Sequence, residues 1–587
     1  MTIHVDSSTP TTAPTHPTAT PINKPAIVLS GGGALGDFEV GAVRCLYNRG
    51  VRPSILCGTS VGSINALKLA EGEDSPFPSA APVGHSRGLA GLEKIWLGLS
   101  SDSDMWDLEP GVADVFKTLN DLPAELSDIA GQADAVGKAS IFGVIGSILG
   151  IPGVLSFAPQ LSDLNRLSGS VSDLIHTICG SLNDAMDIQG FANYDPLERI
   201  MRNPTSFFPA GQQSSGITLR LAMVALEDGA LRYATETNVL VERSGHITKV
   251  TPPPTAAEIA ALKTQRDALI NEISLLEGSQ PGQGGNQGPY QKPKPGIAEK
   301  RAELAQVKAK LARMLMPRDL IRAAIASSSL PVVCRPTPMW DGYTYIDGGI
   351  RTLAPVEAAI EVGATKVFAI AAGSPQMEVK SLADIGSNTP LPLLGIALRV
   401  GEEILPNEVG HRDLYPSNRW PVPVIVIQPN IDVDVHDGMT IEPGLIRIRM
   451  AYGFMRAYDT VRAYDKWPGA YLSLAQQNSA NGMTNEIIKK RREIWDAEFP
   501  ANGKKFVLPG SSLPPSPYTV QNLSAPDKNA LDNVRKLKLE LKQLLEKRVA
   551  FYADAQNNIK GEESLPADFG TWSTHWEKHN WTPTATL

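Results

Sequence analysis

Two glycine-rich turns, separated by a single short strand, constrain the fold of this chain more than any other feature. The first is Gly31-Gly32-Gly33-Ala34-Leu35-Gly36, and the second is Gly58-Thr59-Ser60-Val61-Gly62, which has the pattern Gly-x-Ser-x-Gly. Glycines on both sides of a serine remove the side chains that would clash in a tight strand-to-helix turn. The second turn therefore predicts an exposed, nucleophilic Ser60, although the pentapeptide alone is equally compatible with an ordinary tight turn.

The segments around both turns have the pattern of alternating strands and helices. Apolar runs at 25–30 and 54–57 predict buried strands, and the segments at 35–48 and 64–71 predict helices. Each glycine turn thus leads from a strand to a helix N-terminus, where unpaired N–H groups and the positive end of the helix dipole converge. The first turn can therefore hold either a phosphate or the oxyanion of an acyl-transfer intermediate.

A nucleotide site is the first alternative, because the first turn also matches G-x-G-x-x-G. That fingerprint expects an acidic residue about 20 positions on, at the end of the next strand, to bind the ribose. Here the next strand ends in Cys57-Gly58-Thr59-Ser60, which offers no carboxylate. A P-loop is also disfavoured, since no Gly-Lys-Ser/Thr follows the glycines.

A serine hydroxyl needs a base within hydrogen-bond reach to act as a nucleophile. Asp347 is the candidate, because the strand-like run from Tyr343 ends in Asp347-Gly348-Gly349. The two glycines permit a sharp turn that aims the carboxylate at a neighbouring strand end, where open α/β sheets build their sites. Ordinary turn chemistry is the alternative explanation for Asp-Gly-Gly on its own.

These motifs, taken in order, resemble the signatures of the patatin-like phospholipases. The resemblance spans roughly residues 24 to 460 and includes two further segments, Tyr194-Asp195-Pro196-Leu197 and Ile325-Ala326-Ser327-Ser328-Ser329-Leu330-Pro331. It implies an α/β fold, a three-layer α/β/α sandwich with a mostly parallel central sheet. Three linked motifs in the right order are far more specific than any one of them.

The resemblance also implies a chemistry. Ser60 would be the nucleophile, Asp347 the base, and the backbone amides of Gly31, Gly32 and Gly33 the oxyanion hole. Supporting roles in shaping the motifs would fall to Gly36, Gly58, Gly62, Gly348 and Gly349. The implied reaction is hydrolysis of fatty-acyl esters of phospholipids through an acyl-enzyme, without metal or cofactor. At position 35 the family commonly has Arg or Lys, whereas this chain has Leu35. The resemblance therefore implies no role for a basic residue beside the oxyanion loop in this chain.

A Ser-Asp-His triad is the second alternative, because His411 and His436 follow Asp347 in the order of the α/β-hydrolases. In that fold several strands normally precede the serine turn, whereas one strand precedes it here. Both histidines have polar neighbours, which favours their interpretation as loop residues. The Ser60–Asp347 dyad is therefore preferred.

Length and composition indicate the number of structural units and the kinds of partner to expect. A chain of 587 residues favours two or more structural units, and 42% hydrophobic with 20% charged residues indicates a soluble globular protein. The net charge of -8 gives no general attraction to nucleic acid or to anionic lipid, so any membrane contact is expected to be transient, local and apolar. The four cysteines are expected to be buried, reduced thiols, since they have no metal-ligand spacing: Cys45, Cys57, Cys179 and Cys334.

Five segments of the chain are distinguished. Residues 1–24 are rich in Thr, Pro and Ser and predict a disordered leader without a Sec signal peptide, which favours a cytoplasmic protein and leaves a non-Sec export route open. The catalytic domain is expected at 25–465. Within it, the apolar, glycine-rich stretch 139–162 is either a core-covering segment or a lid that opens the site to lipid. It is diluted by Gly, Ser and Pro, which disfavours a membrane span.

Residues 255–316 form a second insertion, with apolar residues at three-four spacing on both sides of a Gly/Gln/Pro-rich tip. This pattern predicts an antiparallel coiled-coil hairpin. The sequence leaves open whether the hairpin mediates oligomerisation. Pairing of the two helices with each other is favoured, because it already buries both rows of apolar residues, the two seams of the hairpin. Residues 466–587 predict a helical C-terminal region.

Overall, the sequence predicts a serine acyl hydrolase acting on a phospholipid or another lipid ester. Two alternatives stay open. One is a general esterase or neutral-lipid lipase, and the other is a catalytically silent scaffold or binding protein.

Overall fold

The computed structural model describes most of the chain outside the leader and the insertions. The described ranges are 23–75, 86–109, 192–244, 247–251, 254–278, 296–316, 318–331, 333–374, 404–416, 418, 420–431, 441–464, 472–498 and 525–566. The leader up to residue 22, the predicted lid at 139–162, His436 and Cys179 lie outside these residues. Within the described part of the chain, no helix is long and apolar enough to cross a membrane.

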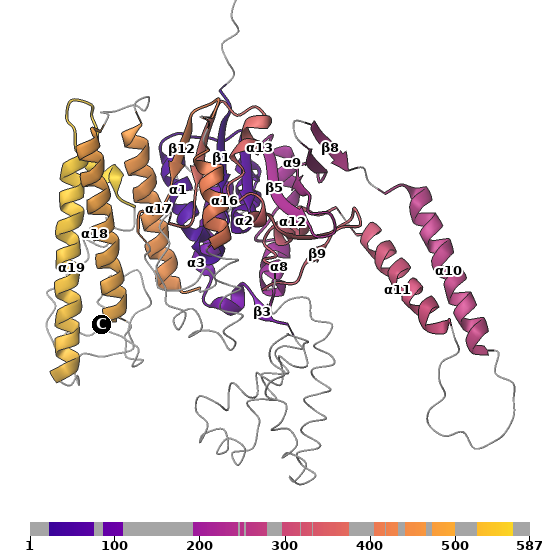
Figure 1. Cartoon of the computed structure of the whole chain (residues 1–587). Helices are drawn as coiled ribbons and strands as arrows, with labels where there is room; N and C mark the ends of the chain where they lie inside the picture. The colour runs from indigo at the N-terminus through magenta and orange to yellow at the C-terminus, as the bar shows by residue number, and fades with distance from the viewer. Residues whose placement is uncertain are drawn as a thin grey trace, which may run out of the picture.

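A 10-stranded mixed sheet forms the centre of the molecule (Figure 1). Its main path runs in the order β12-β11-β1-β2-β5-β6-β7-β8, and β10 pairs with β5 and with β9. The strands are β1 (Pro25–Leu29), β2 (Ile55–Thr59), β5 (Thr218–Ala225), β6 (Leu231–Ala234), β7 (Leu240–Ser244), β8 (Ile247–Thr251), β9 (Thr337–Pro338), β10 (Thr344–Asp347), β11 (Lys366–Ile370) and β12 (Val424–Ile427). A separate two-stranded sheet pairs β3 (Asp107–Leu108) with β4 (Ala192–Asn193).

The strands from β12 through β11, β1 and β2 to β5 run parallel, and the pairs beyond β5 are antiparallel. The parallel strands are apolar because both of their faces are covered. Along β1, Ile27 and Leu29 face one hydrophobic core, whereas Ala26 and Val28 face the other. This alternation shows that the sheet is the middle layer of three.

Helices cover both faces, which confirms the predicted α/β fold class. The larger core lies under α1 (Gly36–Asn48), α2 (Val61–Leu69), α3 (Arg87–Gly98), α8 (Asp195–Arg202), α12 (Leu320–Ser327) and α17 (Pro443–Ala463). The smaller core lies under α13 (Val356–Glu361) and α16 (Leu405–Leu414). A short helix, α9 (Pro209–Ser214), precedes β5.

The closest helix packing in the larger core joins α1 to α17. A Cβ atom added at Gly41 would overlap the Met450 carbonyl, and one added at Gly453 would overlap the Phe38 carbonyl. Each helix therefore presents a glycine to the backbone of the other. A buried ion pair between Asp37 and Arg449, with Nε–Oδ2 at 2.7 Å, fixes the same crossing. Because α1 follows the first glycine turn, this crossing holds that turn in place.

Gly41→Ala is expected to lower the free energy of unfolding by about 3 kcal/mol, because the methyl group forces two backbones apart in a close-packed core. Gly482→Ala is the matched control, since Gly482 is also helical but has nothing within 4 Å of an added Cβ. There, replacing glycine should stabilise the helix by up to about 1 kcal/mol. Urea denaturation followed by circular dichroism measures both, and equal effects of the two substitutions would contradict the crossing.

The 255–316 insertion contains two helices packed along each other, α10 (Ala256–Gly278) and α11 (Ile297–Met314). They project from the body of the molecule (Figure 1). Leu269 and Ile273 on α10 are buried with Val307 and Leu311 on α11, at the spacing that predicted the two seams. Lys300 Nζ lies 2.8 Å from Glu272 Oε2 across the pair. A role in oligomerisation stays a prediction.

On the side away from the hairpin, the C-terminal helix α18 (Leu474–Glu498) packs against α17, and α19 (Ala525–Tyr552) packs against α18 (Figure 1). Buried apolar residues of both helices, such as Ile487 and Leu541, belong to the larger core. Arg548 on α19 is fully buried and donates from Nη2 to Asp459 Oδ1 on α17 at 2.7 Å. Tyr552 donates to the same oxygen at 2.6 Å. This paired, hydrogen-bonded charge joins the C-terminal helices to the helix that supports α1.

Candidate active site

Ser60 sits in the strand-to-helix turn that the sequence predicts, between β2 and α2. Its backbone has φ 54° and ψ -129°, a conformation that non-glycine residues rarely adopt. Such strain persists only where the surroundings hold the residue in place, and it is concentrated at functional sites. The turn therefore has the geometry of a nucleophile elbow.

The flanking glycines are required by close backbone approach. A Cβ at Gly62 would lie 2.5 Å from the carbonyl oxygens of both Leu29 and Ser30, at the end of β1. A Cβ at Gly58 would overlap the carbonyl of Gly62. The Gly62 N–H donates to the Ser30 carbonyl at 3.1 Å, so the serine turn is held directly against the first glycine turn.

Strand pairing brings Asp347 to Ser60. Along β5, Thr59 pairs with Ala222, and the next residue, Met223, pairs with Asp347 on β10. At Met223 the other edge of β5 is already paired with β6. β10 must therefore pair with the same edge of β5 as β2, directly beyond the last residue of β2. The ends of β2 and β10 therefore meet, and a side-chain hydrogen bond joins Ser60 to Asp347.

Asp347 is buried, with 4% of its surface exposed, and its carboxylate has two donors. The Gly349 N–H donates to Oδ1 at 2.7 Å, and the Ser60 hydroxyl supplies the other hydrogen bond. Burial raises the pKa of Asp347 to about 6, while these two hydrogen bonds oppose the rise. A carboxylate with this pKa accepts a proton more readily than an exposed aspartate.

The glycine turn lies beside Ser60, since a Cβ at Gly31 would be 3.2 Å from the Ser60 Cβ. The Gly31 N–H donates to the Leu353 carbonyl at 3.1 Å, so in this conformation it is not available to an oxyanion. The N–H groups of Gly32 and Gly33 have no hydrogen-bond partner within the described residues. These two amides precede α1, where the helix dipole adds positive potential.

Ser327 is a site residue whose role sequence reasoning missed. Its hydroxyl accepts from the Ser60 N–H at 3.0 Å, shares a 2.7 Å hydrogen bond with Ser63 and donates to the Ala222 carbonyl at 2.5 Å. It lies in the Ile325–Pro331 segment that carried part of the resemblance, but nothing in that pattern says what its hydroxyl contacts. Ser327 fixes the backbone of the serine turn from α12.

Ser327→Ala is expected to lower kcat about 10-fold to 100-fold with KM little changed, because small displacements of a reacting group have effects of this size. Ser328→Ala is the matched control: Ser328 is also buried, but its hydroxyl donates to Ala324 within α12, at 3.0 Å. Steady-state kinetics on an acyl ester measure both variants. Equal kcat in the two would contradict the positioning role.

His411 lies on the exposed side of α16, with its ring 5.7 Å from that of Tyr415. It is not among the hydrogen-bond partners of Ser60 or Asp347. Asp413, on the same helix, instead supports the site. Its Oδ2 accepts from the Leu353 N–H at 2.8 Å, which secures the loop whose carbonyl holds Gly31. In the parts of the chain that the structure describes, no cluster of His, Cys, Asp and Glu could hold a metal ion.

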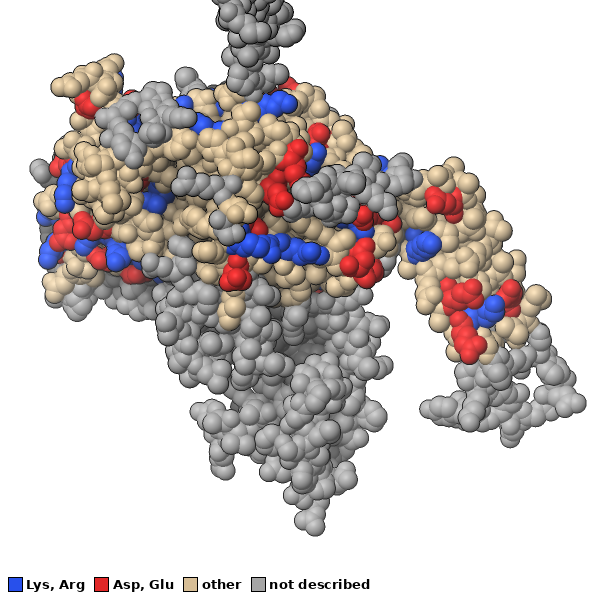
Figure 2. All heavy atoms as spheres, turned by 45° about the horizontal axis from the view of Figure 1, so that its top comes forward, with Lys and Arg blue, Asp and Glu red and all other residues tan. Residues whose placement is uncertain are grey.

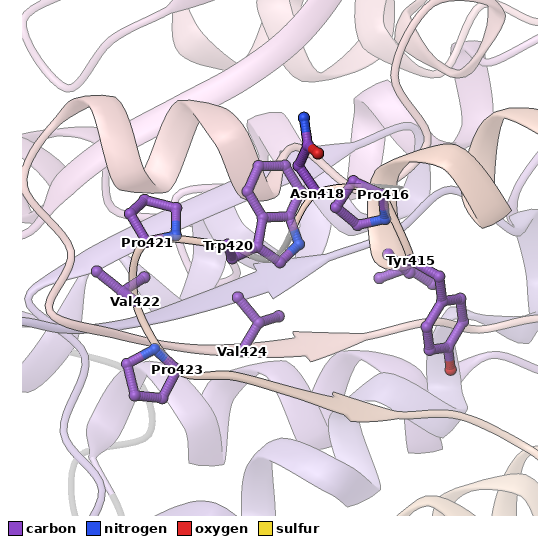
Figure 3. Close-up of a pocket in the computed structure, with 9 residues that line it drawn as sticks. Tyr415, Pro416, Asn418, Trp420, Pro421, Val422, Pro423 and Val424 are labelled. Atoms are coloured by element: carbon purple, nitrogen blue, oxygen red, sulfur yellow. The ribbon is translucent and has the colours of Figure 1, made fainter.

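A cavity of about 470 Å³ lies at the end of the parallel strands opposite to Ser60, lined by Tyr415, Trp420, Pro421 and Val424 among others (Figure 3). The Trp420 ring stands between Pro421 and Pro416 in this view. Val424 is the first residue of β12, whereas Ser60 follows the last residue of β2, and both strands belong to the parallel part of the sheet. This cavity is therefore separate from the Ser60 site.

Charged side chains of both signs are mixed over the described part of the surface that Figure 2 shows. Ion pairs with at least one well-exposed partner include Arg202 with Asp319 and Lys300 with Glu272. Such pairs contribute little to stability, about 0–1 kcal/mol each.

Comparisons with known proteins agree with the motifs. Residues 27–81, which contain both glycine turns, match the family described as patatin-like phospholipase. Over this segment the match confirms the resemblance inferred from the motifs. No curated protein sequence matches the chain.

Among solved structures, the chain is similar to VipD from Legionella pneumophila. The two share 12% sequence identity, and the alignment covers 96% of this chain and 91% of the other, with a TM-score of 0.27. At this score no residue role is carried over.

Proposed function

We propose that the chain is a serine acyl hydrolase that cleaves fatty-acyl esters of phospholipids, with Ser60 and Asp347 as its catalytic dyad. The observation that carries the proposal is the hydrogen bond between a serine in a strained elbow and a buried carboxylate whose pKa is about 6. A nucleophile next to a base of raised pKa is the arrangement that acyl transfer requires.

In the first half of the reaction, Ser60 Oγ attacks the ester carbonyl carbon while Asp347 takes the hydroxyl proton. The carbonyl oxygen becomes an oxyanion, which the N–H groups of Gly32 and Gly33 stabilise. When the tetrahedral intermediate collapses, the bond to the alcohol breaks and Asp347 returns the proton to the departing oxygen. The acyl group is left on Ser60.

In the second half, a water molecule attacks the acyl-enzyme and Asp347 accepts its proton. The same amides hold the second oxyanion, and Ser60 leaves with the proton from Asp347. The products are a fatty acid and the free enzyme. One carboxylate thus acts alternately as base and acid, so the scheme requires no histidine.

The family match supports a lipid ester as the substrate class. The test is to present the purified chain with phospholipid vesicles, a triacylglycerol emulsion and a short-chain acyl ester, and to quantify fatty acid release by mass spectrometry. Fastest release from the vesicles is expected. Preference for the neutral esters would identify a general esterase or lipase instead, and no release from any of them, with a folded chain, would identify a silent scaffold.

A further inference from the structure

Glu39 is a buried carboxyl group that the proposed reaction does not use. It lies in the first turn of α1, is 0% exposed and sits between the two helices that follow the glycine turns. Its Oε2 accepts from Asn65 Nδ2 on α2 at 2.9 Å. Its Oε1 has no hydrogen-bond partner among the described residues. One donor for two buried oxygens is too few for an ionised carboxylate.

Asn65, the hydrogen-bond partner of Glu39, has both of its side-chain N–H groups and its side-chain oxygen in hydrogen bonds. Asn65 Nδ2 also donates to the Gly36 carbonyl at 3.0 Å, and Asn65 Oδ1 accepts from Trp96 Nε1 on α3 at 2.9 Å. Because both amide donor directions are used, Asn65 cannot turn to satisfy Oε1. The Glu39–Asn65 pair therefore joins α1 to α2 and α3 at the level of the two glycine turns.

Among the residues that the structure describes, no Lys or Arg forms an ion pair with Glu39. The neighbouring charged group is Asp37, which has the same sign and is itself paired with Arg449 on α17. Burial raises the pKa of Glu39 well above its usual range; the hydrogen bond from Asn65 opposes the rise, and Asp37 adds to it. Ser30 immediately precedes the glycine turn, and its hydroxyl donates to the Gly31 carbonyl at 2.9 Å.

From this arrangement we propose that Glu39 is an uncharged carboxylic acid that fixes the oxyanion loop relative to the Ser60 turn. Its Oε2 accepts from Asn65, and its proton lies on Oε1, the oxygen without a partner among the described residues. The Ser30 hydroxyl gives its own proton to the Gly31 carbonyl and accepts from the Ala372 N–H at 2.8 Å, so one lone pair of its oxygen remains for the Glu39 O–H. The positioning role rests on the function proposed for Ser60, whereas the protonation state does not. A neutral acid also keeps a buried negative charge away from the developing oxyanion.

The protonation state is tested directly on the full chain by difference infrared spectroscopy at pH 7, as wild type minus Glu39→Gln. The expected difference contains the C=O stretching band of a protonated carboxylic acid. The symmetric and antisymmetric bands of a carboxylate in its place would overturn the proposal. This measurement does not depend on enzymatic activity, so it stands even if the chain hydrolyses no ester.

The positioning role is tested by the rate of ester hydrolysis. Glu39→Gln reproduces the shape and hydrogen bonding of the neutral acid, so kcat should stay within about threefold of wild type. Glu39→Ala should lower kcat about 10-fold to 100-fold with KM little changed. Glu486→Ala, at an exposed position of α18, is the matched control and should have no effect.

If Glu39→Ala does not fold, Glu39→Gln alone decides the question. A loss of activity in folded Glu39→Gln would show that the carboxyl acts as an anion and would overturn the proposal. Unchanged kcat in folded Glu39→Ala would overturn the positioning role. Wild-type chain that shows the acid band but neither hydrolyses esters nor reacts with a fluorophosphonate would refute the proposed function and leave the protonated Glu39 in place.

Discussion

Ser60→Ala is expected to lower ester hydrolysis by about 10⁴-fold or more, because no other group in the site replaces the nucleophile. The same substitution should abolish labelling by a fluorophosphonate probe, which reacts covalently with activated serines. Fluorescence scanning of labelled protein and fatty acid release by mass spectrometry measure the two effects. Both depend on the hydroxyl that is hydrogen-bonded to Asp347.

Ser479→Ala is the control for this experiment. Ser479 is exposed on α18, where its hydroxyl donates only to the Ala475 carbonyl at 3.0 Å, so labelling and hydrolysis should equal those of wild type. Labelling that survives in Ser60→Ala would refute the assignment of the nucleophile. The strain at Ser60 offers an independent check: Ser60→Gly should be inactive yet more stable than Ser60→Ala by about 1–3 kcal/mol, because glycine adopts positive φ without strain.

Asp347→Asn should remove the general base and lower kcat/KM by about 10²-fold to 10⁴-fold. Wild-type kcat/KM should rise with pH, with its midpoint near pH 6, and level off at higher pH, since Asp347 must be ionised to accept the serine proton. This ascending limb should be absent from the residual activity of Asp347→Asn. Asp267→Asn, at an exposed position on α10, should keep both the activity and the limb.

The free energy of unfolding should also depend on the ionisation of Asp347, but it should fall with rising pH where kcat/KM rises. The pKa of Asp347 is about 6 in the folded chain against an ordinary 3.8, so the folded state binds the proton more tightly than the unfolded state. Stability from this group is therefore present below about pH 4 and is lost as pH rises through 6. A difference of about two pKa units corresponds to about 3 kcal/mol.

Asp347→Asn should accordingly be more stable than wild type at pH 8, with the difference disappearing below about pH 4. Urea denaturation at several pH values measures this. A variant that is less stable than wild type at pH 8 would show that the carboxylate is better solvated or paired than the structure indicates. The expected gain in stability at pH 8 would show that the buried base is maintained at the expense of stability, as in many active sites.

Local patterns predicted the elements around the site well. The strand before each glycine turn, the helix after it and the strand that ends at Asp347 all depend on residues within a few positions of one another. Apolar runs, glycine placement and three-four spacing are sufficient for these, because they reflect short-range backbone preferences and burial. The helices of the 255–316 insertion were predictable for the same reason.

The contacts that assemble the site were not predictable from such patterns. The hydrogen bonds of Ser327 to the serine turn, of Gly31 to Leu353 and of Asp413 to the same loop each join segments far apart in the chain. A serine or an aspartate at those positions has no local signature, since its partner is chosen by packing. The same holds for Glu39, which a helical pattern would place in an ordinary charged first turn.

By itself, the sequence determined the two glycine turns, the position of Ser60 between the glycines of the second turn, and the position of Asp347 directly before Gly348-Gly349. Each of these features depends on residues that are adjacent in the sequence, because a tight turn requires particular side chains at particular positions. Only the tertiary structure decided that Ser60 and Asp347 meet, that the Gly31 N–H is already bound to the Leu353 carbonyl, and that His411 lies away from both residues. The physical reason is that β2 and β10 share one edge of β5, and strand pairing over such distances depends on the whole sheet.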